Sequence, residues 1–472
     1  MKNLKSITSI LNMSHKVVVL LLVIAAMPTK ADSSSAYTFE QIKEQINAED
    51  TIHHQCNSST INSYSQRTLS DKQWIEDLAF MVNRLESVHP NPYINIKKEQ
   101  FQIEVKHLKE KIPNYTDNEI IVEFLRIITL IKDGHTRLHG NNLTKKWYPI
   151  RIEQFSDGFY ITASANKYAK YSGSKVIQIN NYTVEEVFDK IKNITPHDNE
   201  FLQKYLSPMY LIMSSVVSGL HITDTSENLT FLIENSDHKQ NKLLIESIEY
   251  KSNDDLGWYW KEYAIPYADY TNIMMHDKDL PLYLKNYNKP FWFEYIKDKN
   301  SVYFCFNECS DSNSESFENF NKGLWEFIDL RKVDSLIIDL RNNFGGTNSI
   351  LKPLIHGIIK HNKINQEGHL FVIVGCKTFS AAMHCATWIE YHCNPIFVGE
   401  PTGASPNHFS DADFSYLPNS KILLMVSKYY WQNSWPWDNR RYIEPKFRIN
   451  LSSEDYFNYR DPVMEKILNV IR

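Results

Sequence analysis

The sequence predicts an α/β protein whose C-terminal part is built on a parallel β-sheet with helices on both faces. Over roughly the last 180 residues, apolar runs of five or six residues alternate with helical patterns. Near-continuous runs of Leu, Ile and Val are typical of strands that are buried on both faces. The chain has 472 residues, of which 42% are hydrophobic and 13% aromatic, and this is enough to bury two or three lobes.

The first 31 residues have the pattern of a secretory signal peptide. Three lysines precede an apolar stretch at residues 17–27, and residues 29–31 offer a cleavage site. The stretch is well short of the ~20 residues that span a bilayer. We therefore expect export to the periplasm, the cell envelope or the medium, with no stable membrane span after the signal is removed. An uncleaved anchor, or a start at Met13, is the alternative.

Residues 32–70 are rich in Ser, Thr, Asn and Gln and show little periodicity, so we expect a loosely ordered lead-in. An N-terminal helical region is predicted over residues 71–146. Apolar residues at helical spacing predict its three helices, near 74–85, 101–112 and 116–132. The third has a capping box at Thr116 and Glu119 and a stop signal at Asp133 and Gly134.

A mixed β/α middle region is predicted over residues 147–290. Alternating apolar patterns indicate short strands, and two helical patterns interrupt them. The strands are expected at residues 148–152, 159–161 and 175–179, and the helices at 184–194 and 202–218.

Residues 291–472 form the predicted sheet domain. Its strands are expected at residues 302–306, 335–340, 370–374 and 396–398, with helices at 314–329, 349–359 and 380–391. Sheets of this kind bind their ligands at the carboxyl ends of the strands. We therefore expect the functional residues in the loops that follow these strands.

Charge and cysteine content exclude several kinds of function. The formal charge of −5 comes from 51 basic and 56 acidic side chains without long blocks of one sign, so no nucleic acid partner is expected. The six cysteines include no Cys-x-x-Cys pair. The His and Cys pairs between residues 384 and 393 are eight positions apart, too far along a helix for one tetrahedral metal site. We expect no metal and no cofactor.

A lone serine follows the strand predicted at residues 370–374. The strand ends in Gly375, the chain turns, and Ser380 stands before Ala381 at the start of a helix of small residues. A hydroxyl in this position lies at the positive end of the helix dipole, beside a backbone N–H that can stabilise an oxyanion. Ser380 is therefore the candidate nucleophile.

A serine nucleophile needs a base and donors for the oxyanion. His135 directly follows a helix stop, which makes it the best candidate base among 17 histidines, although a lone loop histidine is more often simply solvated. Gly345 and Gly346 end a segment after a buried strand, and their N–H groups could form the oxyanion hole with that of Ala381. A plain strand-to-helix loop is the alternative interpretation of that segment.

Two charged residues precede these glycines, Asp339 and Arg341. They are expected to pair with each other and hold the turn rather than to act in catalysis.

Together these segments resemble the tail-specific, or C-terminal processing, peptidases, serine peptidase family S41. The shared motifs occur in the family's order from about residue 71 onwards: Asp-Gly-His-Thr at 133–136, Ile-Asp-Leu-Arg-Asn-Asn-x-Gly-Gly at 338–346, Thr-Phe-Ser-Ala-Ala at 378–382, Gly-Glu-Pro-Thr-Gly at 399–403, Ile-Glu-Pro at 443–445 and Arg-Asp-Pro-Val at 460–463. The resemblance implies a ClpP/crotonase-like catalytic lobe, an acyl-enzyme mechanism without a cofactor, and a peptide or protein substrate.

The sequence departs from the family's Ser-Lys dyad at one position. Counted from Gly399, the dyad lysine would stand where this chain has Ser405, whose hydroxyl has no basic form near neutral pH. Lys377 lies three residues before Ser380 and is expected to be a surface lysine on the turn.

The chain therefore resembles the histidine-using branch of the family, in which His135 would serve as the base and a late acid would orient it. Asp438 lies where that branch carries its acid, and Glu400 and Glu444 are rivals.

The middle region only partly resembles the PDZ-like module by which dyad enzymes hold a substrate's C-terminal carboxylate. Residues 175–181 and the helix after them fit, but a Gly-rich carboxylate loop is not evident. Two other functions remain open. One is a non-catalytic ligand-binding protein on the same fold. The other is an esterase of α/β-hydrolase type, against which the lack of a Gly-x-Ser-x-Gly elbow argues.

Overall fold

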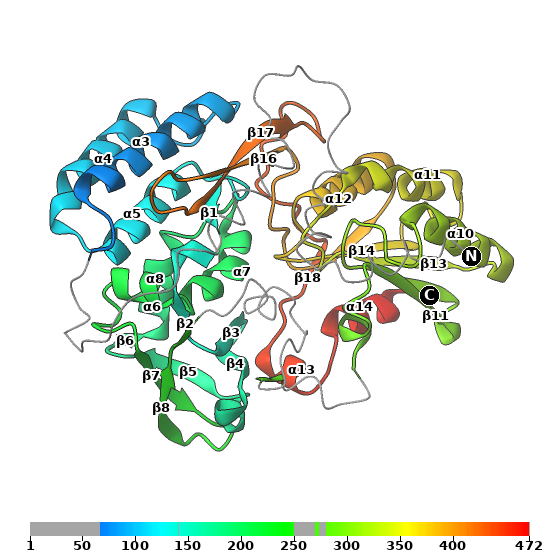
Figure 1. Cartoon of the computed structure of the whole chain (residues 1–472). Helices are drawn as coiled ribbons and strands as arrows, with labels where there is room; N and C mark the ends of the chain where they lie inside the picture. Colours follow the sequence, from blue (N-terminus) through cyan, green and yellow to red (C-terminus); the bar gives the residue numbers. More distant parts are fainter. Residues whose placement is uncertain (1–66, 140, 250–269, 273–279, 472) are drawn as a thin grey trace, which may run out of the picture. The chain divides into compact units, whose positions relative to one another are not determined.

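The structure is a computed structural model that describes residues 67–139, 141–249, 270–272 and 280–471 (Figure 1). The predicted signal peptide and most of the lead-in lie outside these residues. Within the described ranges, no helix has both the length and the apolar character that crossing a membrane requires.

The N-terminal helices form as predicted. They are α3 (Asp71–Val88), α4 (Lys98–Lys111) and α5 (Asp117–Thr129). The predicted capping box is present at the start of α5, where the Thr116 side chain accepts from the Glu119 N–H and the Glu119 side chain accepts from the Thr116 N–H. All three helices bury an apolar stripe in the main core.

The middle region contains an antiparallel sheet with the strand order β10-β4-β5-β7-β8, and β3 and β6 pair at its side. Its strands are β3 (Ile150–Phe155), β4 (Gly158–Ala165), β5 (Lys175–Ile179), β6 (Tyr182–Thr183), β7 (Asn228–Glu234), β8 (Gln240–Glu246) and β10 (Tyr270–Asn272). Helix α6 (Val184–Lys192) follows β6. A two-stranded sheet joins β2 (Lys146–Trp147) to β9 (Ile248–Glu249).

The helix predicted at residues 202–218 is two helices, α7 (Glu200–Leu211) and α8 (Ser214–Gly219). The break lies at Ile212 and Met213, whose backbone pairs with the segment after β2. Ile212 O accepts from Tyr148 N at 2.8 Å, and Met213 forms a β-bridge with Trp147. A distant strand therefore takes backbone bonds that a continuous helix would use.

The C-terminal part contains the predicted parallel sheet, with the order β11-β12-β13-β14-β15-β18. Only the edge strand β11 runs antiparallel to its neighbour. The strands are β11 (Phe291–Ile296), β12 (Ser301–Phe306), β13 (Ser335–Asp339), β14 (Leu370–Val374), β15 (Ile396–Gly399) and β18 (Phe447–Arg448). The helices are α10 (Phe317–Arg331), α11 (Lys352–Lys360), α12 (Ala381–His392), α13 (Ser453–Phe457) and α14 (Pro462–Val470).

Both faces of this sheet are buried, which explains its continuous apolar strands. Along β13, Leu336 and Ile338 belong to the core shared with α10, α11 and α12, whereas Ile337 belongs to a second core with Val463 and Ile467 of α14. Alternate residues of a strand point to opposite faces. The predicted fold class, an α/β protein with a doubly covered parallel sheet, is confirmed.

A further, three-stranded sheet connects the N-terminal region to the C-terminal part, and the sequence did not indicate it. Its order is β1-β17-β16, made of β1 (Arg137–His139), β17 (Leu423–Trp431) and β16 (His408–Tyr416). Strand β1 comes two residues after His135, and it pairs with β17 from Arg137 opposite Met425 to His139 opposite Leu423. This pairing carries His135 toward the sheet domain.

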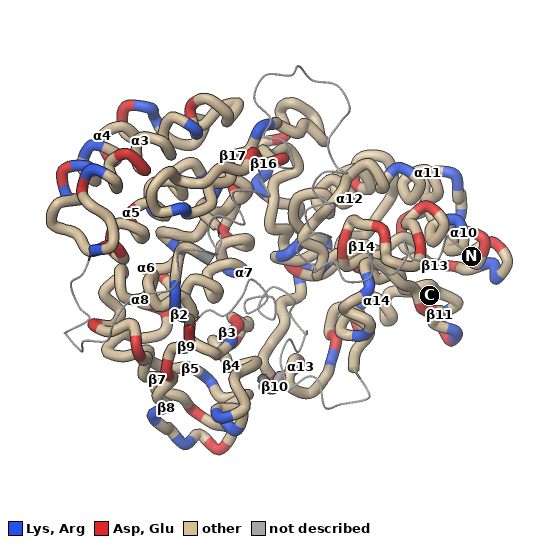
Figure 2. The backbone as a smooth tube through the Cα atoms, viewed as in Figure 1, with Lys and Arg blue, Asp and Glu red and all other residues tan. Residues whose placement is uncertain are grey.

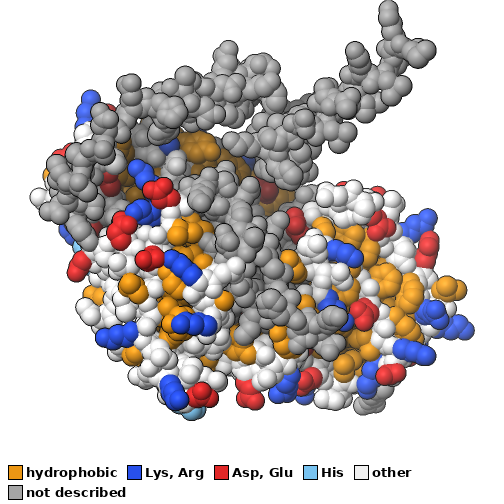
Figure 3. Space-filling model, turned by 60° about the horizontal axis from the view of Figure 1, so that its bottom comes forward, with side chains coloured by type: hydrophobic (Ala, Val, Ile, Leu, Met, Phe, Trp, Pro, Cys, Tyr) orange, Lys and Arg blue, Asp and Glu red, His pale blue; other side chains and the backbone are white. Residues whose placement is uncertain are grey.

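The positions of basic and acidic residues are interspersed along the described elements (Figure 2). The face in Figure 3 likewise shows hydrophobic, basic and acidic side chains mixed over the described surface.

Candidate active site

Ser380 stands between β14 and α12 in a conformation that is rare for a residue with a side chain. Its φ is 51° and its ψ is −127°. Residues held in such conformations cost about 1–3 kcal/mol each and are concentrated at functional sites. Thr378 holds the preceding turn, because its Oγ1 accepts from Gly375 N at 3.0 Å and donates to Leu340 O at 2.9 Å.

Ala381 is the first residue of α12, so its N–H has no acceptor within the helix. The Ser380 carbonyl accepts from Met383 N and His384 N, so Ser380 takes part in the first turn of the helix through its carbonyl. A helix N-terminus of this kind attracts negative charge.

Gly345 packs directly against Ser380. A Cβ at Gly345 would lie 2.6 Å from the Ser380 Cβ and 3.0 Å from the Ala381 nitrogen, and the Gly345 φ of 113° also disfavours a side chain. The structure therefore brings Gly345, Ser380 and Ala381 together, as the sequence predicted for the oxyanion hole. Gly346 lies beside them with its backbone bridged to Cys309.

The Gly345 N–H is already used, because it donates to Asn343 Oδ1 at 2.9 Å. Asn343 is fully buried, and its Nδ2 donates to Phe306 O at 2.8 Å. The sequence does not by itself mark this asparagine as functional, although it stands in the Arg-Asn-Asn-x-Gly-Gly motif. Because the Gly345 N–H is engaged, the Ala381 N–H is the better candidate to donate to an oxyanion. An oxyanion hole formed by Gly345, Gly346 and Ala381 together stays a prediction.

Replacing Gly345 by alanine is expected to abolish reaction of Ser380 with a phosphonate probe and to destabilise the fold, since the new methyl group would overlap the serine. The control is Gly323→Ala in α10, where a Cβ meets nothing within 4 Å. That change should stabilise the protein by about 0.5–1 kcal/mol, because alanine favours a helix over glycine. Probe labelling and urea unfolding of both variants measure the two effects. Unchanged labelling of Gly345→Ala would contradict this packing.

His135 is held by a buried hydrogen-bond network around Asp133. The Asp133 carboxylate accepts from His135 N at 2.9 Å, from Ser427 Oγ at 2.6 Å and from His89 Nε2 at 3.2 Å. Thr136 also donates to it at 2.5 Å. Burial alone would raise the pKa of Asp133, but these donors and the nearby histidines lower it to about 2. Asp133 thus holds the backbone of this turn as a carboxylate.

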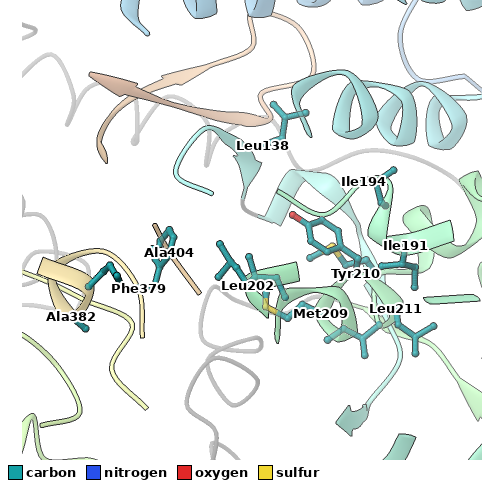
Figure 4. Packing of buried hydrophobic residues seen from close by; sticks show 14 of the residues in the cluster. Leu138, Ile191, Ile194, Leu202, Met209, Tyr210, Leu211, Phe379, Ala382 and Ala404 are labelled. Atoms are coloured by element: carbon teal, nitrogen blue, oxygen red, sulfur yellow. The ribbon is translucent and has the colours of Figure 1, made fainter. Parts of the chain in front are cut away.

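The His135 ring lies on the turn that carries the nucleophile. It stacks on Phe379, the residue before Ser380, with ring centroids 4.3 Å apart, and its Nε2 lies 3.2 Å from Ser410 Oγ. Figure 4 shows Phe379 near Ala404 and Leu202, and a Cβ at Gly134 would touch both Phe379 and Leu202. Burial lowers the pKa of His135 to about 3, so at neutral pH the ring is neutral and can accept a proton.

Two further histidines gather here, and the sequence analysis did not assign them to the site. His408 lies 6.0 Å from His135 and 5.0 Å from His384 between ring centroids, and His384 is on the first turn of α12. The His408 Nδ1 lies 2.8 Å from Ser405 O, which can only accept, so the proton is on Nδ1 and Nε2 is a lone-pair acceptor. Within the described residues that buried Nε2 has no hydrogen-bond partner.

Ser405, which replaces the dyad lysine, therefore contributes its carbonyl to His408. Its hydroxyl donates to Arg441 O at 3.1 Å. The bond to Arg441 joins segments that are 36 residues apart, so the local sequence around Ser405 does not indicate it. Lys377 is partly buried rather than the surface lysine that the sequence predicted, and its Nζ lies 5.0 Å from the centre of the Tyr205 ring.

The three candidate acids pair with residues other than His135. Asp438 accepts from Arg440 Nε at 3.0 Å and from Ser434 Oγ at 2.7 Å, and these bonds lower its pKa to about 2 against the effect of burial. Glu400 pairs with Lys204 at 2.7 Å, and Glu444 pairs with Arg448 at 3.6 Å. Among the described residues, no hydrogen bond joins a carboxylate to this ring, and the orienting role of Asp438 stays a prediction.

Arg341 pairs with Asp339, as expected, and also with Asp461, which the sequence analysis did not connect to it. Its Nε donates to Asp339 Oδ2 and its two terminal nitrogens donate to the Asp461 oxygens, all at 2.9 Å. Tyr303 adds a bond to Asp339 Oδ2 at 2.7 Å. This buried network joins the end of β13 to the start of α14, and it supports the turn that leads to Gly345.

In the part of the chain that the structure describes, no three His, Cys, Asp or Glu side chains are grouped as metal ligands. The five described cysteines are free thiols.

Comparison with known proteins identifies the fold. No protein-family model matches this chain, and no curated protein matches it. Mature CPAF complexed with lactacystin aligns over 85% of this chain and 98% of its own, with a TM-score of 0.59 and 13% identity. A CPAF mutant aligns over 85% and 97%, with a TM-score of 0.61 and 12% identity. The photosystem II D1 C-terminal processing protease aligns over 87% and 98%, with a TM-score of 0.38 and 10% identity. The likeness to CPAF shows that this chain has the S41 peptidase fold.

Proposed function

We propose that this chain is an exported serine-type peptidase of the tail-specific family, in its histidine-using branch. The observation that carries the proposal is the mounting of Ser380, a lone serine with a φ of 51° at the N-terminus of α12 with Gly345 packed against it. The S41 fold, and the motifs that occur in the family's order along the chain, also support the assignment as a serine peptidase. The substrate class is a peptide or protein, and no cofactor is needed for the steps below.

In the first step Ser380 Oγ attacks the peptide carbonyl carbon, and the neutral His135 ring takes the hydroxyl proton. The carbonyl oxygen becomes an oxyanion, which the Ala381 N–H stabilises at the helix N-terminus. The tetrahedral intermediate then breaks its C–N bond, and the protonated His135 returns the proton to the leaving amine. The product is an acyl-enzyme on Ser380.

In the second step a water molecule attacks the acyl carbonyl while His135 accepts one of its protons. The ester bond to Ser380 Oγ breaks, and the proton passes back to that oxygen. The free enzyme and a carboxylic acid result.

His408 is the rival base, because it has a buried, unprotonated Nε2 beside the same cluster. We assign the base to His135 because its ring stacks on Phe379, the neighbour of the nucleophile, whereas His408 contacts the site through His384. Separate variants of the two histidines distinguish these roles.

A fluorophosphonate probe tests the nucleophile. Wild-type protein is expected to react, and Ser380→Ala is expected not to. The control Ser314→Ala, an exposed serine before α10, should react like wild type. Lack of labelling in the wild type, with a bound apolar ligand, would favour the non-catalytic binding protein. Faster turnover of esters with no cleavage of peptides would favour the esterase. The same labelled band, sought in exported and cytoplasmic fractions of the host, tests the export.

A further inference from the structure

A group of exposed aromatic rings lies near the C-terminal end of α12, and the proposed reaction does not use it. Trp435 and Trp437 stack with ring centroids 5.0 Å apart and planes 9° from parallel, and the Tyr391 ring lies 5.3 Å from that of Trp435. The exposed fractions of Trp435, Trp437 and Tyr391 are 50%, 70% and 44%. Exposed groups of large apolar side chains mark interaction sites, since their contact with water is unfavourable. We call these three residues the aromatic platform.

The loop that carries both tryptophans is fixed by hydrogen bonds. The buried Asn407 donates from Nδ2 to Trp435 O at 2.9 Å, and its Oδ1 accepts from Ser434 N at 2.8 Å. Asp438 N also donates to Trp435 O at 2.9 Å. Because the loop is already ordered, binding of a ligand to the platform costs little conformational entropy.

The charged residues beside the platform carry one net negative charge. They line the same surface depression as its rings, and they are Glu390, Asp438 and Arg440. The guanidinium of Arg440 lies between the two carboxylates, 2.7 Å from Glu390 Oε2 and 2.8 Å from Asp438 Oδ2. Two carboxylates share one guanidinium, so one negative charge is not compensated. The next residue along the chain, Arg441, pairs with Glu200 of α7 instead.

Glu390 keeps the capacity to accept further hydrogen bonds, whereas Asp438 does not. Each Asp438 oxygen accepts two bonds, Oδ1 from the N and Nε of Arg440, and Oδ2 from Ser434 Oγ and Arg440 Nη2. Within the described residues each Glu390 oxygen accepts one, from Nη1 and Nη2 of Arg440. A carboxylate oxygen has two lone pairs, so both Glu390 oxygens can accept from a ligand. The Glu390 side chain is 29% exposed and can be reached from solvent.

A planar cation fits both features. The face of a tryptophan ring attracts cations, and the guanidinium of an arginine stacks on such rings while its N–H groups donate to a carboxylate. Tyr391 stands eleven residues after Ser380 along α12, which is roughly 16 Å of helix, and about five extended residues of a peptide span this distance.

We propose that the aromatic platform and Glu390 form an exosite, a binding site outside the catalytic centre, for an arginine side chain of the substrate. The proposal rests on the proposed peptidase function for the identity of the ligand as a peptide, but its binding is measured without turnover.

The test uses the full chain carrying Ser380→Ala and fluorescent fourteen-residue peptides with acetylated and amidated ends. Each peptide carries one arginine in an otherwise neutral sequence, at each position in turn. Its twin carries citrulline at that position, which has nearly the same shape as arginine but no charge. Fluorescence anisotropy gives the Kd of each peptide. We expect at least one arginine peptide to bind about 5- to 10-fold more tightly than its citrulline twin, the gain typical of a cation on an aromatic face beside a carboxylate.

Two variants assign the preference to the platform. Trp437→Leu removes the most exposed ring, and Glu390→Gln removes the uncompensated charge at nearly constant size. Each should reduce the ratio of the two Kd values to below about 2, because each removes one of the two attractions for the guanidinium. The control is Phe414→Leu, an equally apolar change at a ring of β16 that is 61% exposed, and it should keep the full ratio. Thermal unfolding checks that all three variants are folded.

Equal Kd values for all arginine and citrulline twins would overturn the exosite, as would a preference that survives both Trp437→Leu and Glu390→Gln. A dimer in sedimentation experiments that Trp437→Leu abolishes would also overturn it, because the platform would then be a surface between two copies of the chain. The proposed reaction fails separately. Phosphonate labelling without an arginine preference removes the exosite and leaves the peptidase, whereas a preference without labelling leaves a peptide-binding site on a protein that is not a serine hydrolase.

Discussion

Replacing His135 by alanine is expected to lower kcat/KM for a cleaved peptide by about 10³–10⁴, mostly through kcat, because general-base assistance to a serine nucleophile contributes on that scale. The Asp133 network binds the His135 backbone rather than the ring, so the variant should keep its fold. Steady-state kinetics and the rate of phosphonate labelling measure the loss. Labelling should slow in the same proportion, since it needs the same activated hydroxyl.

Two comparisons make this result specific. His356→Ala, at an exposed position of α11, should have wild-type kinetics. His408→Ala should lower the rate less than His135→Ala if its role is to support the cluster. A full loss in His408→Ala together with near wild-type activity in His135→Ala would reverse the assignment and make His408 the base.

Replacing Arg341 by methionine is expected to lower the free energy of unfolding by about 3–5 kcal/mol, because two buried aspartates lose their shared counterion. Asp339 and Asp461 are 2% and 8% exposed, and both accept from this guanidinium at 2.9 Å. Methionine has a similar length, so the loss reports the charge and its hydrogen bonds rather than an empty space. Urea unfolding at constant m measures it.

The matched control is Arg440→Met. Arg440 also bridges two carboxylates, Asp438 and Glu390, but its side chain is 46% exposed. Surface ion pairs contribute about 0–1 kcal/mol, so this variant should unfold almost like wild type. Equal costs for the two arginines would mean that the Asp339–Arg341–Asp461 network does not support the sheet domain.

The sequence by itself determined the elements whose signals are local. The strand predicted at residues 370–374 is β14, and the helix predicted to begin at Ser380 is α12, displaced by one residue. Both follow from apolar runs, glycine and small residues that act within a few positions of one another. Ser380 could be predicted as the nucleophile for the same reason, since its position depends on one strand, one turn and one helix that are adjacent in the sequence.

Only the tertiary structure decided which residues meet Ser380. His135 reaches the nucleophile's turn because β1 pairs with β17, nearly 290 residues further along the chain, and His408 enters through β16 of the same sheet. Arg341 meets Asp461, and a helix predicted as continuous breaks at Met213 to bridge Trp147. These outcomes depend on the burial and backbone pairing of distant segments, where the gain from non-local contacts outweighs local propensity. A single sequence carries the propensity of each segment but not the identity of its partner.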